Sequence, residues 1–110
     1  MARILLTAGP TRAFIDDVRY LTNASSGRMA VALAAAALAR GHEVTIVSGP
    51  VQVAYPRQAR VVPVTTTAEM LSAALAELPS CDGVIAAAAP CDFEPLVQAS
   101  GKIPRQGDGL

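Results

Sequence analysis

A short apolar run that ends at a Gly-Pro pair, followed by a polar loop and an alanine-rich segment, constrains the fold of this chain more than any other feature. The run Ile4-Leu5-Leu6 is typical of a buried strand, and Gly9-Pro10 ends it. Ser25-Ser26-Gly27 then precedes residues 28–40, whose alanine content gives the strongest helix propensity in the chain. A serine N-cap, unpaired first-turn amides and the helix dipole together favour an anion there. The pattern predicts either a phosphate site or an ordinary capped helix that binds nothing.

The apolar runs alternate with a second helical segment. We predict strands at 3–7, 43–47, 60–64 and 83–88, and helices at 25–39 and 68–78. This order implies a largely parallel sheet with helices on its faces, which is a three-layer α/β/α, Rossmann-like fold. We expect residues 1–110 to form a single domain, and residues 94–110, which are rich in Gly and Pro, to form a loop or flexible tail.

Composition argues against several classes of function. The formal net charge is zero and aromatic residues are few, so we expect no nucleic-acid partner. The apolar runs are too short to span a membrane and no leader pattern precedes the first strand, so we expect a cytoplasmic protein without a membrane partner. Cys81, Cys91 and His42 show no metal-ligand spacing, and we expect no metal site in the protein. We interpret Cys81 and Cys91 as small residues and His42 as a turn residue beside exposed helix carbonyls.

Six motifs occur in one order along the chain. They are Thr7-Ala8-Gly9-Pro10-Thr11-Arg12, Asn23-Ala24-Ser25-Ser26-Gly27, Ser48-Gly49-Pro50, Thr67-Ala68-Glu69-Met70-Leu71, Ala86-Ala87-Ala88-Ala89-Pro90-Cys91-Asp92-Phe93 and Lys102-Ile103. Together they resemble phosphopantothenate-cysteine ligase, which in many bacteria is the C-terminal part of a bifunctional flavoprotein of coenzyme A biosynthesis. The resemblance covers the whole chain but only the N-terminal portion of a ligase domain, so the fold would be incomplete relative to that family. Arg28 and Pro104 stand where the family usually has basic lysines.

The resemblance implies a carbon-nitrogen ligase. The family activates the carboxylate of 4′-phosphopantothenate with a nucleotide, usually CTP with Mg²⁺, and forms an acyl-cytidylate and pyrophosphate. The amine of cysteine then displaces CMP and forms an amide. The resemblance also implies a homo-oligomer and a phosphopantothenoylcysteine decarboxylase as a fused or separate partner.

The family's site residues match positions in this sequence. Asn23 would be catalytic, because an amide can donate to a developing oxyanion, and Lys102 would be catalytic by stabilising phosphate charge. An asparagine in a turn and a solvated tail lysine are the alternatives. The residues implied at the nucleotide and its phosphates are Gly9, Ser25, Ser26, Gly27, Ala88, Ala89 and Asp92.

Two other interpretations stay open at this point. The chain could be a catalytically inactive nucleotide-binding or interaction fragment of the same fold. It could also be an NAD(P)-dependent oxidoreductase, although Gly9 and Gly27 are too far apart for the compact G-x-G-x-x-G turn and Ser48-Gly49-Pro50 brings no acidic residue for a ribose.

Overall fold

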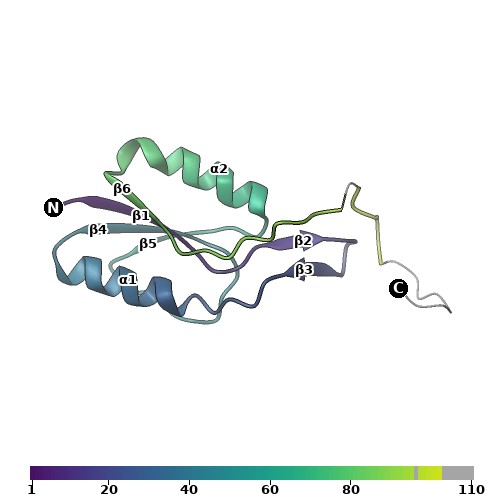
Figure 1. The fold of residues 1–110 in the computed structure, drawn as a ribbon, viewed down its shortest axis with the longest axis horizontal. Helices are drawn as coiled ribbons and strands as arrows, with labels where there is room; N and C mark the ends of the chain where they lie inside the picture. Colours follow the sequence, from purple (N-terminus) through teal and green to yellow (C-terminus); the bar gives the residue numbers. More distant parts are fainter. Residues whose placement is uncertain (96, 103–110) are drawn as a thin grey trace.

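A four-stranded parallel sheet forms the centre of the computed structural model, which describes residues 1–95 and 97–102. The sheet order is β5-β4-β1-β6, with the bounds Arg60–Pro63, Glu43–Ser48, Arg3–Ala8 and Gly83–Ala86. Figure 1 shows α1 (Arg28–Ala39) and α2 (Thr67–Glu77) on opposite sides of this sheet. The three layers confirm the predicted α/β/α fold class. Within the described residues, no helix has the length and hydropathy that a membrane crossing needs.

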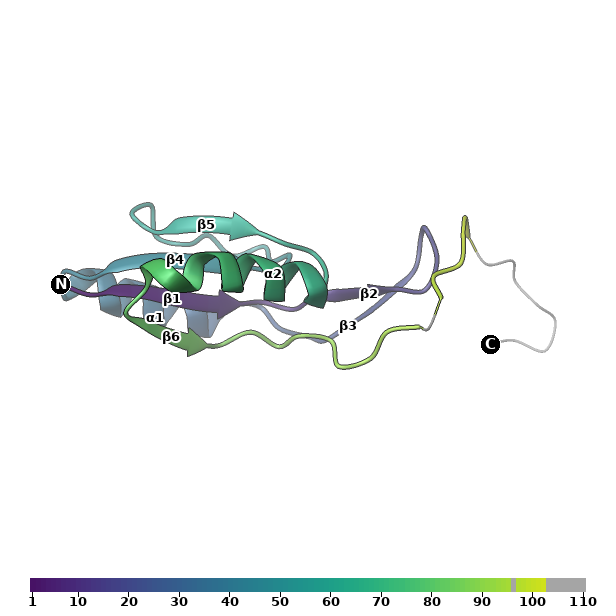
Figure 2. The same ribbon diagram turned by 90° about the horizontal axis from the view of Figure 1, so that it is seen from above.

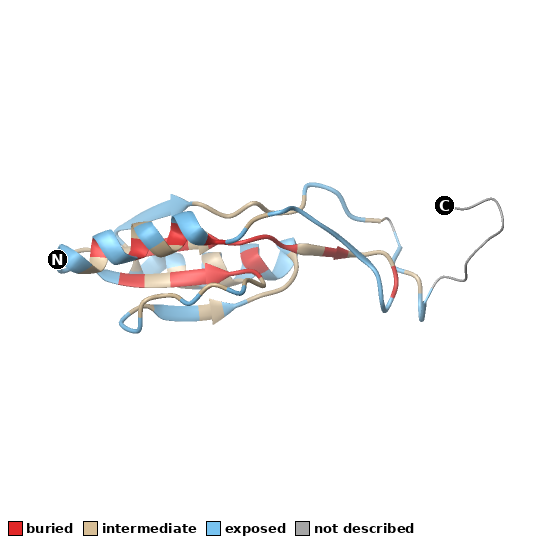
Figure 3. Ribbon diagram, turned by 90° about the horizontal axis from the view of Figure 1, so that it is seen from below, coloured by how far each residue is buried: buried red, intermediate tan, exposed pale blue. Residues whose placement is uncertain are grey.

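Successive side chains of a strand point to opposite faces of the sheet, so neighbouring residues of β1 pack against different helices. On one face of the sheet, Leu6 packs against Ala30 and Ala34 of α1, and these three side chains are buried. On the other face, Leu5 packs against Met70 of α2. Each fully buried leucine contributes about 1.5–3 kcal/mol relative to an exposed one. Figure 3 shows the buried residues concentrated where the sheet and the helices meet.

The start of α1 differs from the prediction. The helix begins at Arg28 and not at residue 25, and its N-cap is Gly27, which has a left-handed φ of 81°. A Cβ on Gly27 would lie 3.1 Å from Val51 Cγ1 and 3.2 Å from the Tyr55 hydroxyl. The predicted serine N-cap is therefore wrong, because tertiary packing places glycine at the cap position. Ser26 still takes part, since its Oγ accepts a hydrogen bond from the Arg28 N–H at 3.3 Å.

A hairpin of two short antiparallel strands occupies the predicted polar loop. It consists of β2 (Arg12–Phe14) and β3 (Tyr20–Thr22). Asp16 is fully buried in the turn, where its Oδ1 accepts hydrogen bonds from the N–H groups of Val18 and Arg19 at 2.8 and 2.6 Å. Figure 2 shows the hairpin projecting beyond the carboxyl ends of the sheet strands.

The other element boundaries lie close to the predicted ones. β5 ends at Pro63 and β6 at Ala86, so both strands are shorter than expected at the carboxyl end. α2 covers Thr67–Glu77 and continues as the 3₁₀ turn η1 (Leu78–Ser80). Of the segment predicted as a loop or tail, residues 94, 95 and 97–102 form no helix or strand, while residues 96 and 103–110 lie outside the described residues.

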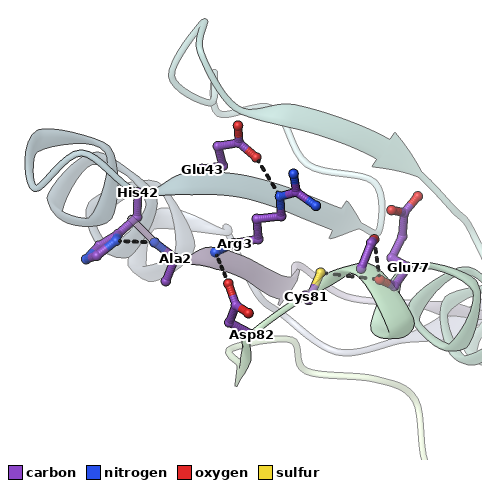
Figure 4. A network of polar contacts seen from close by, with 8 residues as sticks. Ala2, Arg3, His42, Glu43, Glu77, Cys81 and Asp82 are labelled. Atoms are coloured by element: carbon purple, nitrogen blue, oxygen red, sulfur yellow. Dashed lines mark hydrogen bonds and ion pairs between the residues drawn. The ribbon is translucent and has the colours of Figure 1, made fainter.

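The amino edge of the sheet is held by polar contacts that Figure 4 shows from close by. His42 Nδ1 accepts a hydrogen bond from the Ala2 N–H at 3.0 Å. The ring of His42 thus binds the residue before β1, while the His42 N–H donates to the Ala37 carbonyl at 3.1 Å, as expected of a turn residue beside exposed helix carbonyls. Asp82 Oδ2 accepts the Arg3 N–H at 2.8 Å, and Cys81 lies half-buried between η1 and β6. These contacts stabilise the edge opposite the candidate site.

Candidate functional site

The carboxyl ends of β1, β4 and β6 converge through backbone contacts. The Gly49 N–H donates to the Ala8 carbonyl at 3.0 Å, and the Ala89 N–H donates to the Gly9 carbonyl at 2.9 Å. A Cβ on Gly49 would lie 1.6 Å from the Pro10 carbonyl oxygen, so this approach of two backbones requires glycine. In open α/β sheets, ligands bind at the carboxyl ends of the strands. The predicted residues Gly9 and Ala89 therefore meet where a ligand would sit.

The loop after β4 covers the two predicted phosphate-site glycines. Gly9 has a φ of +73°, and a Cβ there would lie 2.8 Å from Val51 Cγ1. A Cβ on Gly27 would meet the same valine methyl. Tyr55 from this loop also bonds through its hydroxyl to Ser48 Oγ at 2.7 Å, which ties the loop to the end of β4. Gly9 and Gly27 are thus separated in sequence but brought together under one loop.

A hollow of about 330 Å³ lies at the start of α1. Its lining includes Ser25, Ser26 and Arg28 from the start of α1 and Pro50–Val53 from the covering loop. The first turn of α1 contains no acidic residue, so the partial positive charge of the helix start has no carboxylate of its own helix beside it. Hydroxyls, first-turn amides and an arginine are donors that suit an oxyanion. The lining of this hollow thus includes donor types that suit a phosphate group.

The start of α2 is chemically different because it carries its own carboxylate. Thr66 Oγ1 accepts the Glu69 N–H at 3.1 Å, and Glu69 Oε1 accepts the N–H groups of Thr66 and Thr65 at 2.9 and 3.2 Å. This is a capping box. Hydrogen bonds from the Thr66 backbone, the Thr66 side chain and the Thr65 backbone lower the pKa of Glu69 below its usual value. An external anion is therefore disfavoured at α2 relative to α1.

Asn23 reaches across to the segment that follows β6. Its Nδ2 donates to the carbonyl oxygens of Ala89 at 3.2 Å and Pro90 at 2.9 Å. The predicted catalytic asparagine thus contacts a residue predicted at the nucleotide. An amide nitrogen carries two hydrogens, and these two carbonyls can accept both, so among the described residues Oδ1 is the side-chain atom of Asn23 left for a ligand. The predicted donation to an oxyanion would require Nδ2 to release one of the two carbonyls.

Asp92 lines a different hollow from Ser25 and Ser26. This second hollow has a volume of about 430 Å³ and lies between β2, the start of α2 and residues 91–95 and 98. Arg12 also lines it, with its guanidinium 4.4 Å from the centre of the Tyr20 ring. The sequence predicts one nucleotide site that contains Asp92, Ser25 and Ser26. In the structure Asp92 lines this second hollow, whereas the two serines line the hollow at α1. Ala88 lies half-buried against the cluster of Leu5, Val47 and Met70 on the α2 side of the sheet, and Ala89 lines neither hollow.

Lys102 lies beside the hairpin turn and not among the residues at the sheet edge. The neighbouring Gly101 exchanges two hydrogen bonds with Asp17, one from the Asp17 N–H at 3.0 Å and one to Asp17 Oδ2 at 2.5 Å. Asp17 belongs to the turn between β2 and β3. The lysine is exposed. The structure therefore does not bring Lys102 to the residues with which it was predicted to act.

Two site residues that the sequence did not indicate are Thr11 and Thr67. Thr11 is fully buried after β1, and its Oγ1 lies 2.7 Å from Thr67 Oγ1 at the start of α2. Both hydroxyls also bond to the backbone of Cys91, whose thiol donates to the Phe93 carbonyl at 3.2 Å. No local pattern could have shown this cluster, although two of the family motifs contain Thr11 and Thr67. Among the described residues, no three side chains of His, Cys, Asp or Glu gather where a metal ion could be held.

Comparisons with known proteins place these features in a family. Residues 1–110 match the family model described as the DNA/pantothenate metabolism flavoprotein, C-terminal domain. The coenzyme A biosynthesis bifunctional protein CoaBC of Vibrio parahaemolyticus is 46% identical over 105 residues, which are 96% of this chain and 26% of that protein.

Solved structures show the same fold. The crystal structure of the C-terminal domain of a coenzyme A biosynthesis bifunctional protein CoaBC superposes with a TM-score of 0.83 at 44% identity, covering 87% of this chain and 48% of that one. A Cab2 variant solved with phosphopantothenate-cysteine gives a TM-score of 0.84 at 16% identity, covering 98% of this chain and 54% of that one. The chain thus spans about half of the solved domain and about a quarter of the curated relative. The family that the sequence motifs predicted is confirmed, and this chain belongs to the DNA/pantothenate metabolism flavoprotein C-terminal domain family.

Proposed function

We propose that this chain is the N-terminal portion of a phosphopantothenate-cysteine ligase, a carbon-nitrogen ligase of coenzyme A biosynthesis. The observation that carries the proposal is its similarity over 96% of its length to a bifunctional coenzyme A biosynthesis protein. The solved Cab2 complex supports the same substrate class, because a protein of this fold holds phosphopantothenate-cysteine. The polar groups at the carboxyl edge of the sheet are consistent with such a ligand.

The proposed reaction has two steps. The carboxylate of 4′-phosphopantothenate attacks the α-phosphorus of CTP, which forms an acyl-cytidylate and releases pyrophosphate. The amine of cysteine then attacks the acyl carbonyl, so that an amide C–N bond forms, the C–O bond to CMP breaks and the ammonium proton is released. Both steps depend on positioning and on charge stabilisation more than on covalent chemistry by side chains.

The nucleotide phosphates are proposed to bind at the start of α1. Ser25 and Ser26 offer hydroxyls, Arg28 offers a guanidinium, and Gly9 and Gly27 let the backbone approach closely. The donor set fits Mg²⁺ only as an ion carried by the triphosphate, since the described residues provide no carboxylate cluster around this hollow. When bound, Mg²⁺ would screen the triphosphate charge.

The acyl group and the base are proposed to lie beside the segment after β6. Ala88 and Ala89 supply backbone next to the base, and Asn23 holds this backbone while its Oδ1 faces the ligand. Asp92 would contact the nucleotide from the second hollow. Lys102 would assist activation by stabilising phosphate charge, which requires the Asp17–Gly101 contacts to open.

Three further parts of the proposal concern the surroundings of the enzyme. We propose a cytoplasmic location, a homo-oligomer and a phosphopantothenoylcysteine decarboxylase partner. The bifunctional relative supports the last of these, because this chain covers only 26% of it.

The second candidate function is a nucleotide-binding or interaction fragment without ligase activity. It is favoured by the partial coverage of the solved domain and by β6, an edge strand whose residues Gly83–Ala86 are exposed. An NAD(P)-dependent oxidoreductase is a weaker candidate, because the first loop lacks the compact glycine turn and β4 ends in Ser48.

A chimera tests the ligase proposal. This chain would replace the matching 105 residues of the Vibrio parahaemolyticus protein, and pyrophosphate release would be measured with CTP or ATP. We expect release that requires 4′-phosphopantothenate and is faster with CTP, and product formation that also requires cysteine. The 110-residue chain assayed alone should bind CTP weakly and turn over little. A folded chimera without nucleotide-dependent amide formation would favour the fragment interpretation.

A further inference from the structure

Two threonine hydroxyls hold the backbone of Cys91 at both its amide and its carbonyl. The Cys91 N–H donates to Thr11 Oγ1 at 2.7 Å, and Thr67 Oγ1 donates to the Cys91 carbonyl oxygen at 3.1 Å. The two hydroxyls lie 2.7 Å apart. Because the Thr67 hydrogen goes to the carbonyl, the Thr11 hydrogen must go to Thr67 Oγ1. The result is a closed ring of hydrogen bonds with one consistent direction.

The same short segment is held from its other side by Asn23. The carbonyls of Ala89 and Pro90 accept from Asn23 Nδ2, and the next residue is the one inside the threonine ring. The Ala89 N–H also donates to the Gly9 carbonyl. Residues 89–91 are therefore fixed by contacts from the segment after β1, from the residue after β3 and from the start of α2. Ala89, the first of them, is one of the two residues whose backbone the ligase proposal puts beside the base.

Thr67 is not needed to begin its own helix. The capping box uses Thr66 and Glu69, and Thr67 follows the cap as the first residue of α2. Thr67 is exposed, so its hydroxyl could bond to water instead. The two hydrogen bonds of Thr67 therefore hold the segment after β6 and play no part in capping α2.

We propose that Thr11 and Thr67 are positioning residues, which order the backbone of residues 89–91 for nucleotide binding in the ligase reaction. The inference rests on the proposed function. Neither threonine reacts. Each acts through Cys91, and the ordered backbone lowers the entropic cost of binding the base and the acyl-nucleotide.

The test uses the chimera described above with three variants. Thr67→Val keeps the shape and removes the hydroxyl, whereas Thr67→Ser restores it. Thr45→Val makes the same chemical change in the middle of β4, away from the ring. We expect Thr67→Val to raise KM for CTP roughly three- to tenfold with little change in kcat, as expected for the loss of one or two neutral hydrogen bonds. Thr67→Ser should return KM to the original value.

Amide exchange and a double-mutant cycle provide independent measurements. Exchange at the Cys91 amide should quicken in Thr67→Val and not in Thr45→Val. Thr11→Val and Thr67→Val should be non-additive in KM because they share one ring. An active chimera whose Thr67→Val variant matches Thr45→Val, or whose Thr67→Ser variant is no better than Thr67→Val, overturns the positioning role alone. A folded chimera without ligase activity overturns the proposed function, and this role with it.

Discussion

Replacing Asn23 by aspartate tests the centre of the proposed site. The side chain keeps its size, but Nδ2 becomes an oxygen that cannot donate to the carbonyls of Ala89 and Pro90, now 3.2 and 2.9 Å away. Each neutral hydrogen bond contributes about 0.5–1.5 kcal/mol net, so the pair contributes about 1–3 kcal/mol. Repulsion between the new carboxylate and the two carbonyl oxygens adds to this loss.

The expected kinetic effect follows from these magnitudes. If the positioning energy is lost in the transition state, acyl-cytidylate formation should slow by roughly five- to 150-fold, since each 1.4 kcal/mol corresponds to about a factor of ten. The second step should fall further, because the carboxylate also repels the oxyanion that develops on the acyl carbonyl. Asn23→Asp should therefore accumulate acyl-cytidylate relative to product.

Single-turnover experiments with the chimera separate the two steps. Quenched samples give the acyl-cytidylate and the amide product as functions of time. The matched control is Gln58→Glu, which makes the same amide-to-carboxylate change at an exposed loop residue before β5. Formation at the original rate would refute the positioning argument, and equal slowing of both steps would refute the additional effect on the oxyanion.

Three further changes test the structure around the site. Gly49→Ala should lower the free energy of unfolding by about 3 kcal/mol or more in urea titrations, because its Cβ would overlap the Pro10 carbonyl, whereas Gly83→Ala, with no atom within 4 Å, should not. Glu69 has a lowered pKa in the folded protein, so its stabilising contribution is present above the usual value of 4.5 and is lost as pH falls through the folded value. The stability difference between the native protein and Glu69→Gln should therefore shrink from pH 7 to pH 3, and a constant difference would contradict the assignment. CTP affinity should fall as salt rises, and Arg28→Gln should flatten that dependence in titration calorimetry.

The sheet and both helices could be predicted because their signals are local. The runs around Leu5 and Ile46 are apolar, and the alanines of α1 favour a helix. The β2–β3 hairpin could not be predicted from periodicity, since each strand has three residues and all of β3 is exposed. The Asx turn at Asp16 was the available signal for it.

Only those residues of the candidate site that lie within sequence motifs could be predicted. Family motifs led to Asn23 and Gly9, and the structure brings both to Ala89. Thr11 and Thr67 were missed because they are far apart in sequence and meet only through the sheet. No pattern within a short window contains such a contact.

The two helix starts explain why we propose an anion site at α1 and not at α2. Both helices point their first turns toward the carboxyl edge, yet α2 brings Glu69 to its own amides and α1 brings no acidic residue. At α1 the cap is Gly27, whose lack of a side chain lets Val51 and Tyr55 pack over it. Those contacts come from the loop that lines the hollow with Ser25 and Ser26. The glycine that displaced the predicted serine cap therefore lets the loop form the wall of the proposed phosphate site.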